Sequence, residues 1–262
     1  MNKVSIALFI NGTLGERILK YLLTLDNIKI SQIVLNSPSK RSGDYVSRLE
    51  SIIGESNSAP IKMHCWMENM HQNIQEINSI GRFDFGISAF FGHLLPLDII
   101  ELAKTDFCNL HPSLLPMGRG AHPIPWSVID SLKQGVSIHR LAEGLDQGDI
   151  FIQKEINTDI GMNSGEIYEV ALDELHQMFI KFFPNWISNN KKPIKQDLNG
   201  STFHFSTELE DLRNLRFDES GSFETFIRRI QGVTFSETKG AVFVDKEGNQ
   251  WSLKLNLKRI VN

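Results

Sequence analysis

An asparagine and a histidine stand two positions apart where a short apolar strand is expected to end. Asn109 and His111 close the segment "DFCNLH", and Asp146 follows in the turn "GLDQGD". Alternate side chains of a strand point to the same side, so Asn109 and His111 would face one cavity. An amide donor beside an imidazole can stabilise an oxyanion on a carbonyl under attack, and a nearby carboxylate favours the protonated imidazole. These three residue types and their spacing therefore predict electrostatic and acid–base catalysis. The alternative interpretation is a histidine in a loop next to an asparagine that caps a turn, with no catalytic role.

The histidines are not spaced as metal ligands. His111, His122 and His139 lie in the same stretch of chain as Asp146 and Asp149. None of them forms an H-x-x-x-H or H-E-x-x-H pattern, and the one nearby cysteine does not complete a zinc set. We therefore expect no metal.

The sequence indicates neither a dinucleotide site nor a nucleophilic serine. The first strand-to-helix turn has Gly12 and Gly15, but Ile10 stands where G-x-G-x-x-G needs its first glycine. The second strand closes on Asn36 rather than on an acidic residue. Ser113 lies outside any G-x-S-x-G elbow, so its hydroxyl is expected to hydrogen-bond the loop backbone.

Strands that alternate with helices would position these residues. Strands are expected at 3–10, 28–36, 83–91 and 106–111, and helices at 13–25, 43–53 and 95–103. This alternation is typical of βαβ units, so the predicted fold class is α/β, a Rossmann-like and mostly parallel sheet. Ligands bind beyond the carboxyl ends of such strands, so the loops of Asn109 and Asp146 are expected to meet at one edge.

The second half of the chain continues the pattern and then changes composition. A helix is expected at 123–132, strands at 135–144 and 148–156, a second helix at 222–230 and a β-hairpin at 241–260. The longest helix should run from Ser164 to Phe183, with Asn163 and Glu166 as a capping box and Pro184 as its end. A polar segment from Asn189 predicts a boundary between a catalytic domain and a small C-terminal domain. These domains would span 1–190 and 200–262.

The composition is that of a folded globular chain without a strong charge. The 262 residues are 41% hydrophobic and 22% charged, with a net charge of −4, which gives no electrostatic basis for binding nucleic acid. Asn11 and Gly12 interrupt the apolar N-terminal run, and no window approaches the about 18 apolar residues of a membrane helix. Cys65 and Cys108 have apolar or aromatic neighbours, so we expect buried free thiols and a cytoplasmic protein.

One long segment resembles the formyltransferase family that uses 10-formyltetrahydrofolate. The family pattern is Asn-x-His-x-Ser-x-Leu-Pro-x-x-Arg-Gly, then Gly-x-x-x-His, then Leu-Asp-x-Gly-x-Ile. The matching residues are Asn109, His111, Ser113, Leu115, Pro116, Arg119 and Gly120, then Gly135 and His139, then Leu145, Asp146, Gly148 and Ile150. The upstream segment "ISAFFGHLLPLDII" is similar to the family's pterin loop, so the resemblance covers residues 83–156.

The resemblance implies a reaction and the residues that carry it. An amine would attack the formyl carbon of the folate, with Asn109, His111 and Asp146 as the catalytic triad and no metal. The folate head group would lie among backbone groups of two loops. These loops hold His93, Leu94 and Leu95, and Ala142, Leu145 and Asp146.

The resemblance also limits which amine is expected to accept the formyl group. Residues 201–262 hold nine Lys or Arg and nine Asp or Glu, which suits tRNA poorly, and glycinamide ribonucleotide enzymes lack such a C-terminal segment. The C-terminal segment is similar to that of sugar N-formyltransferases, so a dTDP- or GDP-linked 4-amino-4,6-dideoxyhexose for surface polysaccharide (O-antigen, lipopolysaccharide) is expected. Ala121 stands where the UDP-aminoarabinose enzymes have arginine, which counts against that sugar. Methionyl-tRNA is the alternative acceptor, and a non-catalytic module on the same fold comes last.

The acceptor would meet the loop after His111. Its candidate contacts are Ser113, Arg119, His122 and Trp126. Arg119 could bind a phosphate or brace the loop. The family resemblance also implies a homodimer.

Overall fold

The computed structural model describes residues 3–40, 42–56, 58–79, 81–236 and 239–260. The chain forms two compact units, each assembled from separate segments. The first unit comprises Met1–His111, Ile138–Ile152 and Leu175–Lys195, and the second comprises Pro112–Ser137, Gln153–Glu174 and Gln196–Asn262. A domain boundary near Asn189 stays a prediction.

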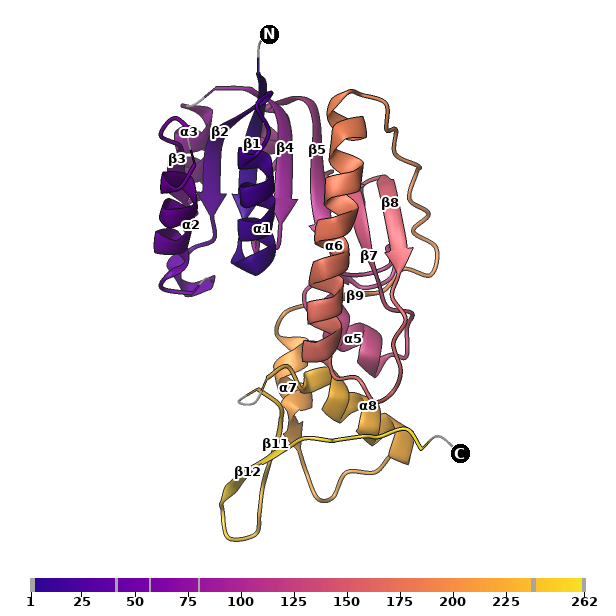
Figure 1. The fold of residues 1–262 in the computed structure, drawn as a ribbon. Helices are drawn as coiled ribbons and strands as arrows, with labels where there is room; N and C mark the ends of the chain where they lie inside the picture. The colour runs from indigo at the N-terminus through magenta and orange to yellow at the C-terminus, as the bar shows by residue number, and fades with distance from the viewer. Residues whose placement is uncertain (1–2, 41, 57, 80, 237–238, 261–262) are drawn as a thin grey trace. The chain divides into compact units, whose positions relative to one another are not determined.

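A seven-stranded sheet organises the chain, in the order β3-β2-β1-β4-β5-β7-β8 (Figure 1). Its strands are β3 (Lys62–Cys65), β2 (Ile28–Leu35), β1 (Val4–Ile10), β4 (Phe83–Ala89), β5 (Ala103–His111), β7 (Gly135–Arg140) and β8 (Ile150–Glu155). All neighbours from β3 to β5 pair in parallel. The mostly parallel α/β sheet expected from the sequence is therefore confirmed.

Side chains on both faces of the first unit's strands are buried. Its helices are α1 (Gly12–Leu23), α2 (Tyr45–Gly54), α3 (Met70–Asn78) and α4 (Leu97–Ile100), with a short 3₁₀ turn, η1 (Pro38–Lys40). Phe9 of β1 packs in a cluster with Ile77 of α3 and Ile99 of α4. Leu8 points to the opposite face by strand alternation and is also fully buried. Burial on both faces explains why β1 reads as a continuous apolar run.

The long helix α6 (Ser164–Ile187) begins as expected but ends later. Asn163 accepts from the backbone N–H of Glu166 at 3.1 Å, and the Glu166 carboxylate accepts from the Asn163 N–H at 2.8 Å, which confirms the capping box. The expected end at Pro184 was wrong, because the helix continues for three more residues. Trp186, 1% exposed, packs 4.7 Å from the ring of Phe85 on β4, and this burial offsets the hydrogen bond that proline cannot make.

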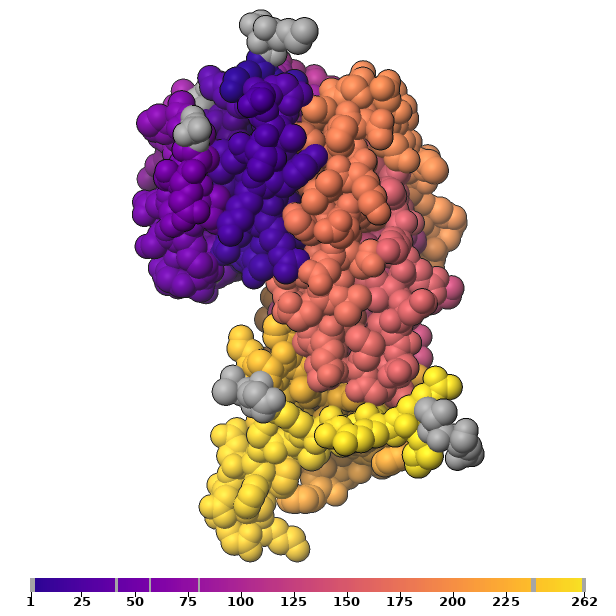
Figure 2. Space-filling view, viewed as in Figure 1, coloured from indigo at the N-terminus to yellow at the C-terminus, as the bar shows by residue number. Residues whose placement is uncertain are grey.

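The C-terminal half of α6 covers the sheet beside α1. The ring of Tyr21 lies 6.1 Å from that of Phe179 and 6.0 Å from that of Phe183, both edge to face. Figure 2 shows the indigo N-terminal residues directly against the orange surface of α6. Among the described helices, none is long and apolar enough to cross a membrane.

The second unit is built from short elements. They are β6 (Arg119–Gly120), α5 (Pro123–Ile129), β9 (Phe203–His204), α7 (Glu208–Arg213), β10 (Asn214–Leu215), α8 (Phe223–Val233), β11 (Ala241–Val244) and β12 (Gln250–Leu253). The expected hairpin is present as β11 paired antiparallel to β12, but its second strand ends at Leu253, and β10 adds a third strand in parallel. Ile230, Val233 and Ala241 form the core of this unit.

Candidate active site

Strand β5 delivers the first two candidate residues at its carboxyl end. His111 is the last residue of the strand and is 6% exposed, whereas Asn109 is half-buried. The two side chains lie on the same side of β5, as their spacing predicts. The buried neighbours Phe107, Cys108 and Leu110 fix the strand in the sheet.

The loop between β7 and β8 delivers Asp146 from a left-handed backbone conformation. Asp146 has φ 53° and is 8% exposed. This conformation is uncommon for a residue other than glycine. A hydrogen bond of 2.8 Å from the Arg140 N–H to the Asp149 carbonyl closes the base of the loop. A Cβ atom added to Gly148 would lie 1.8 Å from the Arg140 carbonyl oxygen, so only glycine allows this closure.

A fourth residue, His139 on β7, completes the cluster. The Asp146 Oδ1 lies 3.8 Å from His111 Nδ1 and 3.5 Å from His139 Nε2. Asn109 Nδ2 lies 3.0 Å from His139 Nε2 and 3.5 Å from Asp146 Oδ1. The three residues predicted to act together are therefore within one cluster of the first unit, and His139 joins Asn109 to it.

The hydrogen bonds of His139 orient the amide of Asn109. His139 is fully buried, and its Nδ1 lies 2.9 Å from the Arg140 backbone carbonyl. A carbonyl oxygen only accepts, so Nδ1 carries the hydrogen and, in the neutral ring, Nε2 accepts from the Asn109 amide. The longer 3.5 Å contact to Asp146 leaves the second amide hydrogen of Asn109 weakly held.

This arrangement suits attack on a carbonyl. An amide N–H can donate to developing negative charge, an imidazole can act as a general acid or base, and a nearby carboxylate can stabilise an imidazolium. The 3.8 Å separation between His111 and Asp146 is longer than a hydrogen bond, as is common before a substrate tightens a site. Among the described residues, no three His, Cys, Asp or Glu side chains are placed to hold a metal ion.

The loop after β4 carries the predicted pterin contacts and is held by the end of β2. The Gly92 N–H donates to Asn36 Oδ1 at 2.9 Å, and Lys40 Nζ donates to the Gly92 carbonyl at 2.8 Å. The Ser37 N–H donates to His93 Nε2 at 3.3 Å. Phe90, just before the loop, has φ 54°. These contacts fix the backbone that was expected to meet the folate.

The imidazole of His93 is kept neutral by its surroundings. Its ring stacks on Trp66 with centroids 5.4 Å apart. Burial, and then the Lys40 cation, lower the pKa of His93 to about 4. A neutral ring leaves Nε2 free to accept the Ser37 N–H, so the side chain braces the loop and the backbone remains for a ligand.

Two leucines of the predicted pterin site are exposed and one is not. Leu94 is 59% exposed and Leu145 is 37% exposed, whereas Leu95 is 6% exposed. Leu95 packs into the same core cluster as Leu141, which lies beside the half-buried Ala142. The loops after β4 and β7 therefore converge on one cluster, and each leaves an apolar side chain in solvent.

The predicted acceptor contacts all lie in the second unit. Ser113 donates to the Met117 carbonyl at 2.8 Å, as expected for a loop brace, and Arg119 Nη2 donates to Ser201 Oγ at 3.0 Å. His122 is exposed at the start of α5 with φ 54°. Trp126 is 8% exposed and stacks on His204 with centroids 3.7 Å apart. The role of these four residues in binding an acceptor stays a prediction.

Several residues of the site were not predicted for the part they play. From the sequence alone, His139 is considered only as a possible metal ligand and as a position of the family pattern. Its place on a buried strand, two residues before the loop of Asp146, is the signal that could have indicated a role beside Asp146. Asn36 is considered there only as the non-acidic end of the second strand, which argues against a dinucleotide site. The clamp made by Asn36 and Lys40 depends on a partner, Gly92, that is 56 positions from Asn36, so local sequence gave no indication of it.

The mostly parallel sheet brings an amide, an imidazole and a carboxylate together beyond the carboxyl end of β5. Residues 19–183 match the model of the Formyl transferase family, and residues 208–259 match the N-formyltransferase dimerization C-terminal domain. The chain belongs to the formyl transferase family and is a formyl-transferring enzyme.

The chain is similar both to a sugar formyltransferase and to methionyl-tRNA formyltransferases. The chain is 26% identical to dTDP-4-amino-4,6-dideoxyglucose formyltransferase of Mycobacterium bovis, over 90% of this chain and 96% of the relative. It is 29% identical to methionyl-tRNA formyltransferase of Clostridium botulinum, over 64% of this chain and 54% of the relative. Its fold is similar to that of the Helicobacter canadensis N-formyltransferase solved with folinic acid and dTDP-3-aminofucose. That likeness has a TM-score of 0.68 and 18% identity, over 88% of this chain and 80% of the other.

Proposed function

We propose that this enzyme moves the formyl group of 10-formyltetrahydrofolate to the amine of a nucleotide-linked amino sugar, of the dTDP- or GDP-4-amino-4,6-dideoxyhexose type. The cluster of Asn109, His111 and Asp146 carries the proposal. Distances of 3.5 Å and 3.8 Å join the three side chains through one oxygen of Asp146.

In the proposed mechanism, each residue has a separate part. The neutral amine attacks the formyl carbon, and negative charge develops on the formyl oxygen. The N–H of Asn109 that Asp146 holds only weakly and protonated His111 stabilise that charge, and Asp146 stabilises the imidazolium. The attacking amine loses a proton and the folate nitrogen gains one as the carbon–nitrogen bond breaks. His111 and Asp146 are the groups placed to carry that proton.

The folate donor fits the two converging loops. The exposed Leu94 and Leu145 offer apolar contact to a flat ring, and neighbouring backbone groups offer hydrogen bonds. His93 contributes through its backbone, because its side chain is already hydrogen-bonded to Ser37. Ala142 and Asp146 complete the proposed donor site.

A sugar nucleotide is favoured over tRNA as the acceptor. The alignment with the mycobacterial sugar enzyme includes 90% of this chain and 96% of the relative, whereas the methionyl-tRNA relatives of Clostridium botulinum and Mycoplasma capricolum align with 64% and 80% of this chain and with 54% and 67% of their own. Residues 201–262 have no net charge, so they offer no excess of positive charge to an RNA backbone. Arg119 and the stacked pair of Trp126 and His204 are the proposed contacts to the nucleotide, with Ser113 and His122 bracing the loop.

We extend the proposal to the oligomeric state of the enzyme, the use of its product and its cellular location. The match of residues 208–259 to a dimerization domain supports a homodimer. Formylated amino sugars would serve surface polysaccharide synthesis such as that of O-antigen, and the enzyme would act in the cytoplasm, where folates and activated sugars are available.

Substitution of the cluster tests the mechanism. Asn109→Ala, His111→Ala and Asp146→Ala should each lower kcat by on the order of a hundredfold or more, since each removes a group that acts in the transition state. His71→Ala, at an exposed position on α3, is the matched control and should keep full activity. Thermal unfolding of each variant separates lost chemistry from lost folding. Wild-type turnover by any of the three would remove that residue from the mechanism.

A substrate panel tests the acceptor. The enzyme is incubated with 10-formyltetrahydrofolate and dTDP-, GDP- or UDP-linked 4-amino-dideoxysugars, and with charged initiator tRNA. Turnover of a dTDP or GDP sugar is expected. Formylation of the tRNA alone would replace the sugar proposal with the methionyl-tRNA activity while keeping the mechanism.

A further inference from the structure

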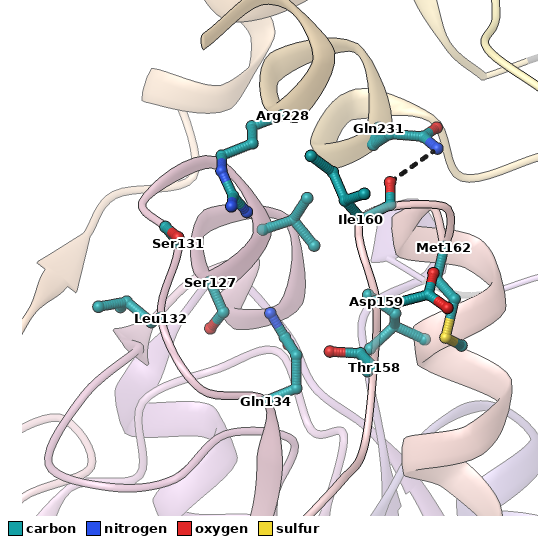
Figure 3. A pocket seen from close by; sticks show the side chains of 12 residues that line it. Ser127, Ser131, Leu132, Gln134, Thr158, Asp159, Ile160, Met162, Arg228 and Gln231 are labelled. Atoms are coloured by element: carbon teal, nitrogen blue, oxygen red, sulfur yellow. Dashed lines mark hydrogen bonds between the residues drawn. The ribbon is translucent and has the colours of Figure 1, made fainter. Parts of the chain in front are cut away.

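A polar cavity of about 170 Å³ lies in the second unit, and none of the residues assigned a role above lines it (Figure 3). Its walls come from α5 and the turn after it, from residues 158–162 and from α8. The residues on which the argument depends are Val128, Ser131, Leu132, Gln134, Ile160 and Arg228. The cavity is comparable in size to the roughly 150 Å³ hole that admits benzene in an engineered protein, so it has room for a small organic molecule.

One wall presents an amide side chain that has no hydrogen-bond partner within the described residues. Gln134 is 6% exposed, and its backbone carbonyl accepts from the Ile156 N–H at 2.9 Å, which fixes its main chain. Among the residues that the structure describes, none hydrogen-bonds its side-chain amide, which Figure 3 shows extended into the cavity. An amide at a cavity wall that the protein leaves unpaired can hydrogen-bond the polar group of a ligand.

The opposite wall presents an oriented guanidinium. Arg228 Nε donates to Glu224 Oε1 at 2.8 Å, one turn earlier on α8, and this pair holds the side chain in place. Within the described part of the chain, its two terminal nitrogens have no hydrogen-bond partner, and Figure 3 shows them directed toward the space that Gln134 enters. The Ser131 side chain also lines the cavity.

The acidic residue that lines the cavity does not neutralise this pair. Asp159 Oδ1 accepts from the Gly161 N–H at 2.8 Å, so the carboxylate is used within its own turn. In Figure 3 it is directed away from Arg228 and Gln134. The centre of the cavity therefore offers hydrogen-bond donors: a guanidinium, an amide and a hydroxyl.

These donors and their surroundings fit one chemical class. A guanidinium on one wall and an amide on the opposite wall can each donate to an oxygen of a carboxylate. Val128, Leu132 and Ile160 provide apolar surface for a short hydrocarbon chain. A phosphate would require more than one cation and would leave these apolar walls without contacts. We propose that the cavity binds a small organic carboxylate between Arg228 and Gln134, an inference independent of the transferred group and its acceptor.

Binding is measured on the full-length protein by isothermal titration and by thermal unfolding. The probes are sodium acetate, propionate and lactate, with propionamide as the uncharged match to propionate and inorganic phosphate as the other anion, all at constant ionic strength. We expect saturable binding of at least one carboxylate, with a concentration-dependent rise in unfolding temperature and no such rise with propionamide. Failure of all three carboxylates to bind, or equal binding of propionamide or of phosphate, would overturn the proposal.

Variants on the two walls locate the site. Arg228→Gln and Gln134→Leu should each raise the Kd of the carboxylate at least tenfold. The matched control Arg216→Gln removes an exposed arginine of the same unit and should leave the Kd unchanged. His111→Ala should bind the carboxylate as well as wild type does. If the carboxylate were held in the formyl-transfer site instead, this variant would lose affinity for it. Unchanged Kd in a folded Arg228→Gln protein contradicts the assignment.

Discussion

At the scale of single residues, His139 is expected to position Asn109 without taking part in the reaction itself. His139 touches no reacting atom in the proposed mechanism, but its Nε2 accepts from the Asn109 amide at 3.0 Å. We expect His139→Leu to lower kcat by on the order of ten- to a hundredfold, because an unheld amide misplaces a donor by a fraction of an ångström. KM for both substrates should change little.

A variant that keeps an acceptor distinguishes this role from general loss of packing. His139→Gln places an amide oxygen within reach of Asn109 and should recover part of kcat. In the double variant Asn109→Ala/His139→Leu, the loss should be no greater than in Asn109→Ala alone. Additive losses in kcat would mean that His139 acts independently of Asn109.

A second residue prediction concerns the proton affinity of His93. Burial, and then Lys40, lower its pKa from 6.5 to about 4, so the unfolded chain takes up the proton first as the pH falls. The stability that His93 provides is therefore fully present above pH 6.5 and is lost as the pH falls toward 4. Titration of the His93 ring by NMR, assigned with His93→Gln, should give a pKa near 4. Lys40→Met should raise that pKa while leaving it below 6.5, and a value near 6.5 in the wild-type protein would contradict the structure.

At the scale of elements, the closed loop between β7 and β8 decides where Asp146 lies. Gly148→Ala would place a methyl group 1.8 Å from the Arg140 carbonyl oxygen, so the loop must open and carry Asp146 away from His111. We expect kcat to fall at least a hundredfold, as for loss of the carboxylate, and the free energy of unfolding to fall by about 1–3 kcal/mol.

Gly54→Ala is the control for this prediction. A Cβ atom at Gly54, the last residue of α2, meets nothing within 4 Å, so the variant should retain both activity and stability. Both kcat and the free energy of unfolding are measured for the two variants. A fully active Gly148→Ala enzyme would show that the close approach to Arg140 is not needed to place Asp146.

At the scale of the whole molecule, the sheet of β10, β11 and β12 offers a surface for the proposed homodimer. The rings of Phe217, Phe243 and Trp251 follow one another at 5.3 Å and 6.5 Å, and Phe217 and Trp251 are 72% and 54% exposed. Contiguous exposed aromatic surface of this kind is typical of interfaces. Trp251→Glu should raise the dimer Kd by roughly thirtyfold, equivalent to about 2 kcal/mol, as measured by sedimentation.

Two further variants make this test specific. Phe217→Glu changes the same row of rings without removing the hydrogen bond from Trp251 Nε1 to Asp245, and it should weaken the dimer as well. Met70→Glu changes a side chain of α3 that is 41% exposed and should leave the mass in solution unchanged. A dimer of equal affinity in all three variants would place the interface elsewhere.

Local physical chemistry explains which parts of the fold could be predicted. Burial of β1 on both faces produces an apolar run, and the cap of α6 produces its Asn163–Glu166 signature, so both could be predicted from a few adjacent residues. The continuation of α6 through Pro184 could not, because it depends on Trp186 packing against Phe85, 101 positions earlier. The strand β3 and the helix α3 were missed because their apolar residues are few.

The sequence by itself predicted the chemistry of the cluster. Strand alternation, a local property, placed Asn109 and His111 on one side of a strand end, and the family resemblance assigned Asp146 as the carboxylate. Only the tertiary structure decided that His139 orients Asn109, that Asn36 and Lys40 hold the loop of His93, and that Arg228 and Gln134 face one cavity. Each of these contacts joins segments far apart in the chain, and their distances are set by packing rather than by local backbone preference.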